Sequence, residues 1–404
     1  MLNRVVITSI GVISSLGFST DEILRRLKEG KVVFERSEFD AGVWTCPVGR
    51  DFNLRDFIGR YKNSRYLNRG AGFCVAAALD AVKTAGLSGE MAARSGLFVG
   101  SGPNLDIGGE FPEILDGNMD RQTLPALWIL KFLPNTAASA IADLAGIHGE
   151  NATIGTACSA SLQAVGEAFR KIRNGYLDLA LAGGGDSRLS PGAVLAYRKA
   201  QALWVGSGDC PAEYSPFDRS RKGFVPGEGG AFFLLESLEH ARARGAKILA
   251  EVCGFGASMD GYNMTAPDPE GRWGEKAVRF ALDEAGISPS GVDVVSAHGT
   301  GTPLNDEMEA GLIDRVFGGS KPFIIALKSW VGHLAAACGA MELAIGLACL
   351  AGGYFPPIRN LRGPCCDGLN FVRESMSVSA ETMLLENFGF GGQNAALVVR
   401  KWTE

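Results

Sequence analysis

Cys158 is the residue whose local sequence most strongly suggests covalent chemistry. It lies in the segment GTACSAS (155–161), between an apolar run that predicts a strand and a small-residue run that predicts a helix. A cysteine at the start of a helix faces unpaired N–H groups and the positive end of the helix dipole, which favour a thiolate. A free cysteine is more often a small buried hydrophobic residue. Its position between strand and helix nevertheless favours a nucleophile.

Two of the four histidines, His298 and His333, stand where they could assist such a nucleophile. His298 directly follows the predicted strand 292–297, and His333 lies in a turn between a second predicted strand and helix. Functional sites of α/β proteins form at the carboxyl ends of core strands. A single histidine there would more often be a hydrogen-bonded core residue, but two histidines with a cysteine favour catalysis. No carboxylate or further cysteine accompanies them at ligand spacing, so no metal site is predicted.

The segment NFGFGGQN (387–394) could supply backbone donors to the same chemistry. It contains no Lys-Ser or Lys-Thr pair and opens no helix, so it does not fit a phosphate-binding loop. Glycine-rich backbone with aromatic side chains beside an active site suits an oxyanion donor and a gate. An ordinary glycine-rich turn before the last strand is the alternative interpretation.

Strands and helices that could position these residues alternate along the whole chain. A run rich in Val and Ile predicts a strand at 4–13, and short apolar runs predict strands at 95–100, 251–257, 292–297 and 394–400. Apolar helical patterns predict helices at 71–85 and 275–285. Such an alternation is typical of βαβ units around a largely parallel, buried sheet.

The segments 152–176 and 323–352 share one plan of strand, sharp turn and helix. In the first helix four apolar residues keep helical spacing, namely Leu162, Val165, Phe169 and Ile172. The second helix is apolar all round, as a helix buried between two layers must be. Two such units predict a duplicated α/β domain with both helices sandwiched between sheets. The less regular segments 119–143 and 187–225 predict insertions over one end of the core.

Composition narrows the class of protein. The chain has 404 residues, of which 46% are hydrophobic and 54 are glycine, and its net charge is −5. These values exclude a largely disordered chain and argue against a general nucleic-acid binder. Nine cysteines without a CxxC pair indicate a reducing, cytoplasmic compartment. The stretch 334–356 is almost wholly apolar but contains Glu342, so a buried core helix is expected there and not a membrane span.

Taken in order, these motifs resemble those of the elongating β-ketoacyl-acyl-carrier-protein synthases, condensing enzymes with the thiolase fold. The resemblance covers nearly the whole chain, and agreement of so many motifs in one order is implausible by chance. The matching segments are VVITSIGVISSLG (5–17), TACSAS (156–161), SPFDRSRKGFVPGEGGA (215–231), NMTAP (263–267), AHGTGTP (297–303), KSWVGHLAAACGAME (328–342) and NFGFGG (387–392).

The resemblance implies an acyltransferase of the α/β class with a thiolase-like fold, in which duplicated βαβ halves form a layered α/β/α/β/α sandwich. The N-terminal half, residues 1–249, would carry the nucleophile and the cap insertions. The C-terminal half, residues 250–404, would carry both catalytic histidines. Family members are dimers, so a homodimer is expected, with a heterodimer of two ketosynthase-like chains as the alternative.

The resemblance also implies a role for each motif residue. Cys158 matches the nucleophile that accepts the acyl chain as a thioester. His298 and His333 match the pair that hydrogen-bonds the malonyl thioester carbonyl and assists its decarboxylation. Lys328 matches the lysine near the second histidine, and Glu342 matches its buried carboxylate partner.

Further matches concern substrate delivery. Phe390 matches the aromatic gate of the acyl pocket, and its N–H and that of Cys158 match the oxyanion donors. Thr300 and Thr302 match hydroxyls that contact the pantetheine arm. No tightly bound cofactor is implied, because the substrates arrive on the phosphopantetheine of acyl carrier protein. Basic residues that could dock this acidic carrier are Arg60, Lys62, Arg65, Arg69, Arg198 and Lys199.

The second histidine indicates the elongating type, since thiolases have a second cysteine and initiating synthases an asparagine at that position. Three departures from the usual motifs leave fatty acid and polyketide or polyene biosynthesis both open, namely Leu327, Lys222 and Gln393. Two alternatives to an active synthase also stay open. One is a catalytically silent, chain-length-factor-like partner subunit, and the other is a Cys-His hydrolase.

Overall fold

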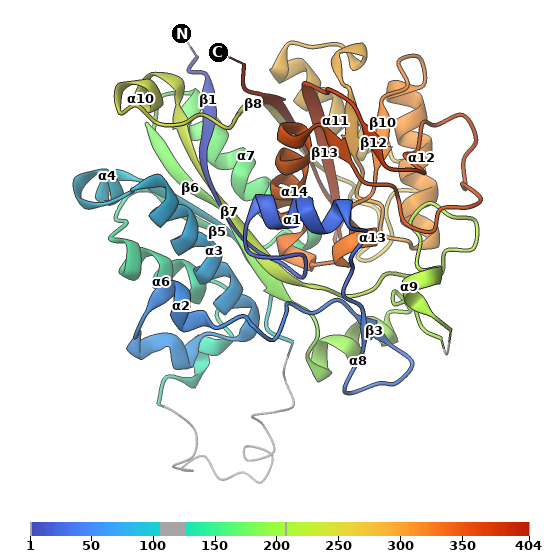
Figure 1. The fold of residues 1–404 in the computed structure, drawn as a ribbon, viewed down its shortest axis with the longest axis horizontal. Coiled ribbons are helices and arrows are strands. Elements are labelled where there is room, and N and C mark those ends of the chain that lie inside the picture. Colours follow the sequence, from blue (N-terminus) through green and yellow to red (C-terminus); the bar gives the residue numbers. More distant parts are fainter. Residues whose placement is uncertain (1, 106–125, 207, 404) are drawn as a thin grey trace.

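The computed structural model describes residues 2–105, 126–206 and 208–403. Within these residues the main sheet has ten strands: β1 (Val5–Ile13), β4 (Gly96–Gly100), β5 (Asn151–Ile154), β6 (Leu179–Ser187), β7 (Glu228–Ser237), β8 (Ala250–Met259), β9 (Val294–Ser296), β10 (Phe323–Ile325), β13 (Thr382–Gly389) and β14 (Gln393–Lys401). Their order across the sheet is β10-β9-β13-β14-β8-β1-β7-β6-β4-β5 (Figure 1). Two short two-stranded ribbons are formed by β2 (Glu35–Arg36) with β3 (Trp44–Thr45) and by β11 (Tyr354–Phe355) with β12 (Met376–Ser377).

The helices of the N-terminal part are α1 (Thr20–Lys28), α2 (Leu54–Ile58), η1 (Lys62–Tyr66), α3 (Arg69–Ala85), α4 (Gly89–Arg94), η2 (Trp128–Lys131), α6 (Thr136–Ala145), η3 (Ala157–Ser159), α7 (Ala160–Arg173), α8 (Pro191–Lys199), α9 (Cys210–Glu213) and α10 (Leu238–Ala243). Those of the C-terminal part are α11 (Arg272–Ala285), η4 (Pro289–Gly291), α12 (Pro303–Phe317), α13 (Lys328–Val331), η5 (Ala335–Ala337) and α14 (Cys338–Gly352). Each strand and helix expected from the sequence is present with slightly shifted ends. Segment 119–143 falls partly outside the described residues, and its described end forms η2 and most of α6.

The expectation of a largely parallel sheet is wrong, because the sheet is mixed. Strands β5, β4 and β6 run parallel, as do β10, β9 and β13, whereas β6–β7, β7–β1, β1–β8, β8–β14 and β14–β13 pair antiparallel. The reason is clearest at β13 and β14, which are joined by a three-residue turn. So short a connection permits only antiparallel pairing.

The two halves of the sheet repeat one pattern, which confirms the duplicated α/β architecture. Each half has three parallel strands followed by two antiparallel ones, β5-β4-β6-β7-β1 in the first and β10-β9-β13-β14-β8 in the second. The halves meet where β1 pairs with β8 over three residues. Helix α3 packs on the outer face of the first half and α11 on that of the second, while α7 and α14 contact strands of both halves (Figure 1).

Helices α7 and α14 form the middle layer and carry the predicted burial patterns. The four apolar residues that keep helical spacing in α7 are fully buried. Every residue of α14 from Cys338 to Leu350 is buried, so this long apolar helix is a core helix, as expected. At Gly339 a Cβ would overlap Leu162 and Asn387, so the absence of a side chain lets the starts of the two helices approach each other.

The turns before these two helices have nearly the same backbone geometry. Ala157 and Ala335 each begin a short 3-10 turn and adopt positive φ angles of 47° and 46°. Such angles are uncommon for residues other than glycine and mark a tight, constrained turn. The first turn presents Cys158, and Ala336 occupies the equivalent position in the second.

Candidate active site

Cys158 lies in the tight turn between β5 and α7, at the amino end of a buried helix. The residue is 7% exposed. The adjacent strand β13 ends at Gly389, where a Cβ would lie 2.7 Å from the Thr156 carbonyl oxygen and 3.3 Å from the Cys158 nitrogen. Glycine is therefore required for the β13–β14 turn to reach the nucleophile.

The thiol of Cys158 is protonated at neutral pH, so the expectation of a thiolate is wrong. Burial raises its pKa to about 11, and the Lys328 ammonium and a hydrogen bond from the Phe390 N–H oppose this rise only in part. The cost of removing water from a small sulfur anion outweighs the stabilisation of that anion by the amino end of the helix. The thiol proton must therefore leave as the sulfur attacks its substrate.

His298 follows β9, and its hydrogen bonds fix the position of its ring proton. Lys328 Nζ lies 3.0 Å from His298 Nδ1, and Asn387 Nδ2 lies 3.1 Å from the same atom. Both neighbours are donors, so Nδ1 accepts and the proton resides on Nε2. Burial, together with Lys328 and His333, holds the pKa of His298 well below its usual value.

His333 reaches the same state through backbone contacts. Its Nδ1 accepts a hydrogen bond of 3.0 Å from the Ala335 N–H, so its proton also resides on Nε2. Its own N–H donates to the Val225 carbonyl at 2.7 Å, and Gly332 beside it adopts φ 72° with no room for a Cβ. Burial, then Lys328, lowers the pKa of His333 well below its usual value, with a smaller contribution from Arg188.

The structure brings Cys158, His298 and His333 together, as the sequence predicted. A sulfur or nitrogen atom from each lies within 4.8 Å of the others, and the two imidazole centres are 5.7 Å apart. Three such atoms could in principle hold a metal ion. The neighbouring Lys328 ammonium opposes a second cation there by electrostatic repulsion.

Lys328 and Glu342 form a buried ion pair beside this cluster. Lys328 Nζ donates to Glu342 Oε1 at 2.5 Å, to the His298 carbonyl at 2.6 Å and to His298 Nδ1, so its three hydrogens all have acceptors. Asn387 Nδ2 donates to the other carboxylate oxygen at 2.7 Å. Lys328 is close to His333 in the chain, but its ammonium contacts His298. The pair thus orients the first histidine.

Replacing Lys328 by methionine should destabilise the fold strongly. The change leaves the Glu342 carboxylate buried without its cation, which costs about 3–5 kcal/mol of unfolding free energy. The double variant Lys328→Met/Glu342→Leu removes both charges and should recover most of this loss. Denaturant unfolding followed by circular dichroism measures both values. As a control, Arg94→Ala removes an exposed ion pair with Asp178 and should cost less than about 1 kcal/mol. Equal losses in Lys328→Met and Arg94→Ala would contradict the structural role of the pair.

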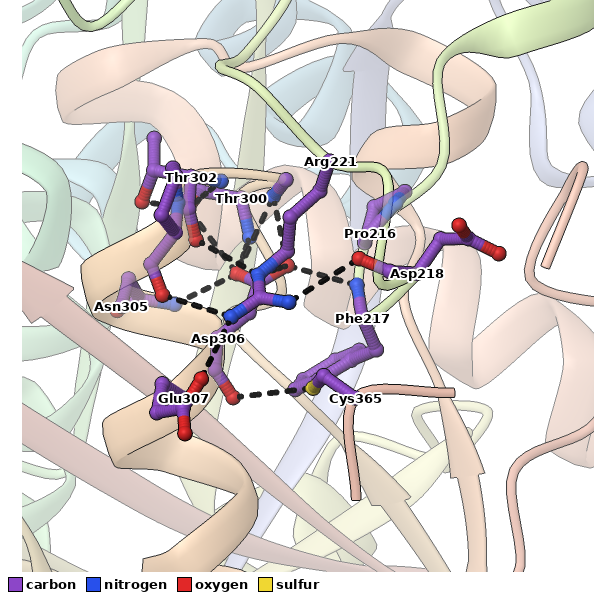
Figure 2. A network of polar contacts seen from close by, with 12 residues as sticks. Pro216, Phe217, Asp218, Arg221, Thr300, Thr302, Asn305, Asp306, Glu307 and Cys365 are labelled. Atoms are coloured by element: carbon purple, nitrogen blue, oxygen red, sulfur yellow. Dashed lines mark hydrogen bonds and ion pairs between the residues drawn. The ribbon is translucent and has the colours of Figure 1, made fainter. Parts of the chain in front are cut away.

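Thr300 and Thr302 lie in the loop between His298 and α12, with their hydroxyls 2.9 Å apart. Asp306, fully buried in α12, accepts hydrogen bonds from the N–H groups of Thr300 and Gly301 (Figure 2). Glu309, one turn further on, accepts from the N–H groups of His298 and Gly299. Two carboxylates of α12 therefore hold the loop.

Arg221 completes this network from the opposite side. It donates to the carbonyl of Thr302 at 3.3 Å and to that of Pro303 at 2.9 Å, and it pairs with Glu307 and Asp306 (Figure 2). Asp306 also accepts from the Phe217 N–H at 2.7 Å. The SPFDRSRKGF segment is thereby fixed against the loop that carries both threonines.

Phe390 lies in the turn between β13 and β14 and is 37% exposed, a high value for a phenylalanine. Its ring makes an edge contact with Tyr197 at 6.5 Å between centroids. Its N–H is hydrogen-bonded to the Cys158 sulfur. An exposed ring on the turn whose backbone contacts the buried sulfur fits the expected gate.

The six basic residues expected to dock the carrier protein fall into two structural groups. Arg60, Lys62, Arg65 and Lys199 are exposed on the surface. The other two are held in ion pairs, Arg69 with the buried Glu228 at 2.5 Å and Arg198 with Asp40. Balanced charges make Arg69 and Arg198 weaker candidates for a docking surface than the other four.

Five further residues near the site were not predicted from the sequence, namely Asn387, Asp306, Glu309, Asp186 and Arg188. Asn387 begins a motif that was recognised for its glycines and Phe390. Asp306 and Glu309 stand three residues apart in the largely buried helix α12, which follows the loop after His298. Acidic residues on a buried helix face require hydrogen-bond or charge partners. Asp306 and Glu309 could therefore have been predicted to bind a neighbouring segment.

Two family profiles match this chain and together cover most of it. Residues 2–241 match the Beta-ketoacyl synthase, N-terminal domain, and residues 249–362 match the Beta-ketoacyl synthase, C-terminal domain. The chain is 35% identical to 3-oxoacyl-[acyl-carrier-protein] synthase 2 of Rhizobium meliloti (strain 1021), with 100% of both chains covered. It is 34% identical to the protein of that name from Synechocystis sp., covering 99% of this chain and 98% of the relative.

Solved structures show the same similarity to ketosynthases. The ishigamide ketosynthase/chain length factor superposes with a TM-score of 0.90 at 31% identity, covering 100% of both chains. A chain of the AntDE:AntF complex, a type II PKS acyl-carrier protein with its ketosynthase bound to the hexaketide, superposes with a TM-score of 0.87 at 28% identity, again over both whole chains. The profiles, the relatives and the arrangement of cysteine and histidines agree: the chain belongs to the β-ketoacyl synthase family of acyltransferases, with the thiolase-like α/β fold.

Proposed function

We propose that this chain extends an acyl group held on Cys158 by decarboxylative Claisen condensation with a malonyl thioester. The observation that carries the proposal is the convergence of one thiol and two neutral imidazoles, each with its proton on Nε2. Two N–H donors beside a nucleophile fit a reaction in which negative charge develops on a substrate carbonyl oxygen. A Cys-His hydrolase needs a single histidine that accepts the thiol proton.

The first step loads the enzyme. The Cys158 sulfur attacks the acyl thioester on the carrier, a carbon–sulfur bond to Cys158 forms, and the bond to the phosphopantetheine sulfur breaks. The thiol proton ends on the departing phosphopantetheine thiol, so charge and protons balance. The N–H groups of Cys158 and Phe390 would stabilise the tetrahedral oxyanion.

The second step makes the new carbon–carbon bond. His298 and His333 would donate their Nε2–H groups to the malonyl thioester carbonyl, so that loss of CO₂ leaves a stabilised enolate. The enolate carbon attacks the Cys158 thioester, the carbon–sulfur bond breaks, and the sulfur takes up one proton. Lys328 and Glu342 act as positioning residues, because they hold His298 as an Nε2–H donor.

The substrates would reach this site on the phosphopantetheine arm of acyl carrier protein, without a tightly bound cofactor. Thr300 and Thr302 would contact the arm, and Phe390 would gate the acyl pocket. A carrier-bound ketosynthase among the structural neighbours supports this partner. We propose a homodimer; the neighbour described as a ketosynthase/chain length factor makes a heterodimer the alternative. The acidic chain is not proposed to bind nucleic acid.

Charge reversal among the exposed basic residues Arg60, Lys62 and Arg65, which precede α3, should weaken docking of the carrier protein. In Lys62→Glu/Arg65→Glu, the KM for malonyl-acyl carrier protein should rise about tenfold relative to the KM for malonyl-pantetheine, because an acidic partner then meets like charge. The ratio of the two KM values at low salt measures the effect. The matched control Arg242→Glu/Lys247→Glu, at exposed positions near α10, should leave the ratio unchanged. An unchanged ratio in the first variant would remove this group as the docking surface.

We also propose that the chain serves fatty acid or polyketide assembly and that it consists of two halves. A hexaketide-bound neighbour and relatives named 3-oxoacyl synthases support polyketide and fatty acid assembly respectively. The halves 1–249 and 250–404 are supported by the repeated strand pattern and the similar turns before α7 and α14. A reducing, cytoplasmic location is supported by nine free cysteines.

One assay tests the function directly. Purified chain is incubated with acyl-loaded and malonyl-loaded carrier protein, and CO₂ release, the Cys158 acyl adduct and the β-ketoacyl product are measured together. The proposal requires all three. Free acid without a β-ketoacyl product would indicate a hydrolase, and an intact chain that forms no acyl adduct would indicate a silent partner subunit.

A further inference from the structure

An arginine and an aspartate that the proposed mechanism does not use are buried beside the nucleophile. Asp186 lies near the end of β6, and Arg188 follows that strand. Arg188 Nη2 donates to Asp186 Oδ2 at 2.7 Å, and the two side chains are 4% and 8% exposed. Arg188 Nη1 donates to the Pro103 carbonyl at 2.7 Å. Among the described residues, Arg188 Nε has no hydrogen-bond partner. A buried donor without an acceptor requires an explanation.

This pair belongs to the immediate surroundings of the active site. Arg188 is among the charges that act on the Cys158 thiol and on the His333 imidazole. Asp186 Oδ2 accepts a hydrogen bond of 3.1 Å from the N–H of Ala336, in the turn that follows His333. Arg188 therefore lies at the same strand ends as the nucleophile and carries a donor with no acceptor in the described part of the chain.

Arg188 and Asp186 also form part of the wall of a cavity of about 630 Å³. Apolar side chains such as Phe52 and Leu133 share the lining of this cavity with hydroxyls such as Ser101 and with charged side chains such as Arg69. A Cβ on Gly102 would overlap the Arg188 guanidinium, so this glycine leaves the space that the guanidinium occupies. Polar and apolar groups share this wall, so the cavity suits an organic group that itself carries polar atoms.

We propose that Arg188 is a specificity-determining residue that hydrogen-bonds a keto or hydroxyl oxygen on the acyl chain carried by Cys158. This inference rests on the proposed condensing function and names its substrate class, oxygenated acyl chains. Asp186 already balances the guanidinium charge, so a neutral acceptor suits the site better than a carboxylate, which Asp186 would repel. A saturated chain against Arg188 leaves the buried donor unpaired and is therefore disfavoured.

Acylation rates of Cys158 test the inference. The donors are pantetheine thioesters of hexanoic acid, of its 3-oxo and 5-oxo derivatives and of adipic acid, with adduct formation followed by mass spectrometry. At least one keto chain should acylate the wild-type chain about tenfold faster than hexanoyl. Arg188→Lys keeps the charge beside Asp186 but loses the Nε donor and the planar fork, so this preference should fall to about twofold or less.

A matched control is Arg244→Lys, the same exchange at an arginine that pairs with the buried Glu236 on the far side of the N-terminal half. This variant should keep the tenfold preference. If Arg188→Lys fails to fold, Asp186→Asn/Arg188→Met removes both charges and the arginine's donors and should likewise lower the preference.

Equal rates for hexanoyl and both keto chains, a preference that survives in Arg188→Lys, or fastest reaction with adipoyl would each overturn the inference. Absence of any adduct with all four donors would instead contradict the proposed function.

Discussion

Cys158→Ala should abolish condensation while sparing malonyl decarboxylation. The variant lacks the sulfur that holds the acyl chain, so β-ketoacyl formation should fall by at least about 10³-fold. His298 and His333 keep their Nε2–H donors, so malonyl thioester should still lose CO₂. Product formation and release of labelled CO₂, measured in parallel, give both rates.

The matched control for this variant is Cys366→Ala, a cysteine at a partly exposed position. It should keep both activities. Persistent β-ketoacyl product in Cys158→Ala would mean that another residue carries the acyl chain.

Replacing either histidine should slow decarboxylation while sparing acyl transfer to Cys158, the opposite of the result expected for Cys158→Ala. In His298→Ala and His333→Ala, one of the two hydrogen bonds to the developing enolate oxygen is lost, so decarboxylation should fall by about 10²–10³-fold. Transfer of the acyl chain to Cys158 does not require a histidine proton and should persist. Adduct formation by mass spectrometry and CO₂ release distinguish the two steps.

A rescue variant tests whether the N–H donor itself matters. His333→Gln places an amide N–H near the position of Nε2 and should recover part of the rate lost in His333→Ala. The control His148→Ala changes an exposed histidine outside the site. If alanine and glutamine at position 333 are equally impaired and adduct formation is lost as well, His333 serves the structure and not the decarboxylation.

The nucleophile and both histidines could be identified from the sequence because local chain geometry determines their positions. Cys158 and His333 stand in turns before a helix, and His298 directly follows a strand. Strand ends at one edge of a sheet lie close together, so residues from distant segments were expected to meet. The structure brings all three within 4.8 Å.

Other properties depend on contacts that the sequence does not determine. Lys328 stands five residues before His333, yet its ammonium contacts His298, because α13 directs it toward Glu342 and Asn387. The protonated state of Cys158 follows from its complete burial, which only the packed structure reveals. The sheet is mixed because some strands are joined by hairpins and others by long connections. The periodicity of apolar residues does not show whether two paired strands run parallel or antiparallel. Arg188 belongs to an irregular segment after β6 and gave no periodic signal at all.

The duplicated architecture has a consequence for how such enzymes can change over evolutionary time. Cys158 belongs to one half of the chain, while His298 and His333 belong to the other, and the starts of α7 and α14 meet at Gly339. Neither half of the chain therefore contains the complete set of reactive groups by itself. Recombination that exchanges one half between distant relatives must preserve this helix contact, or the sulfur and the imidazoles lose their alignment.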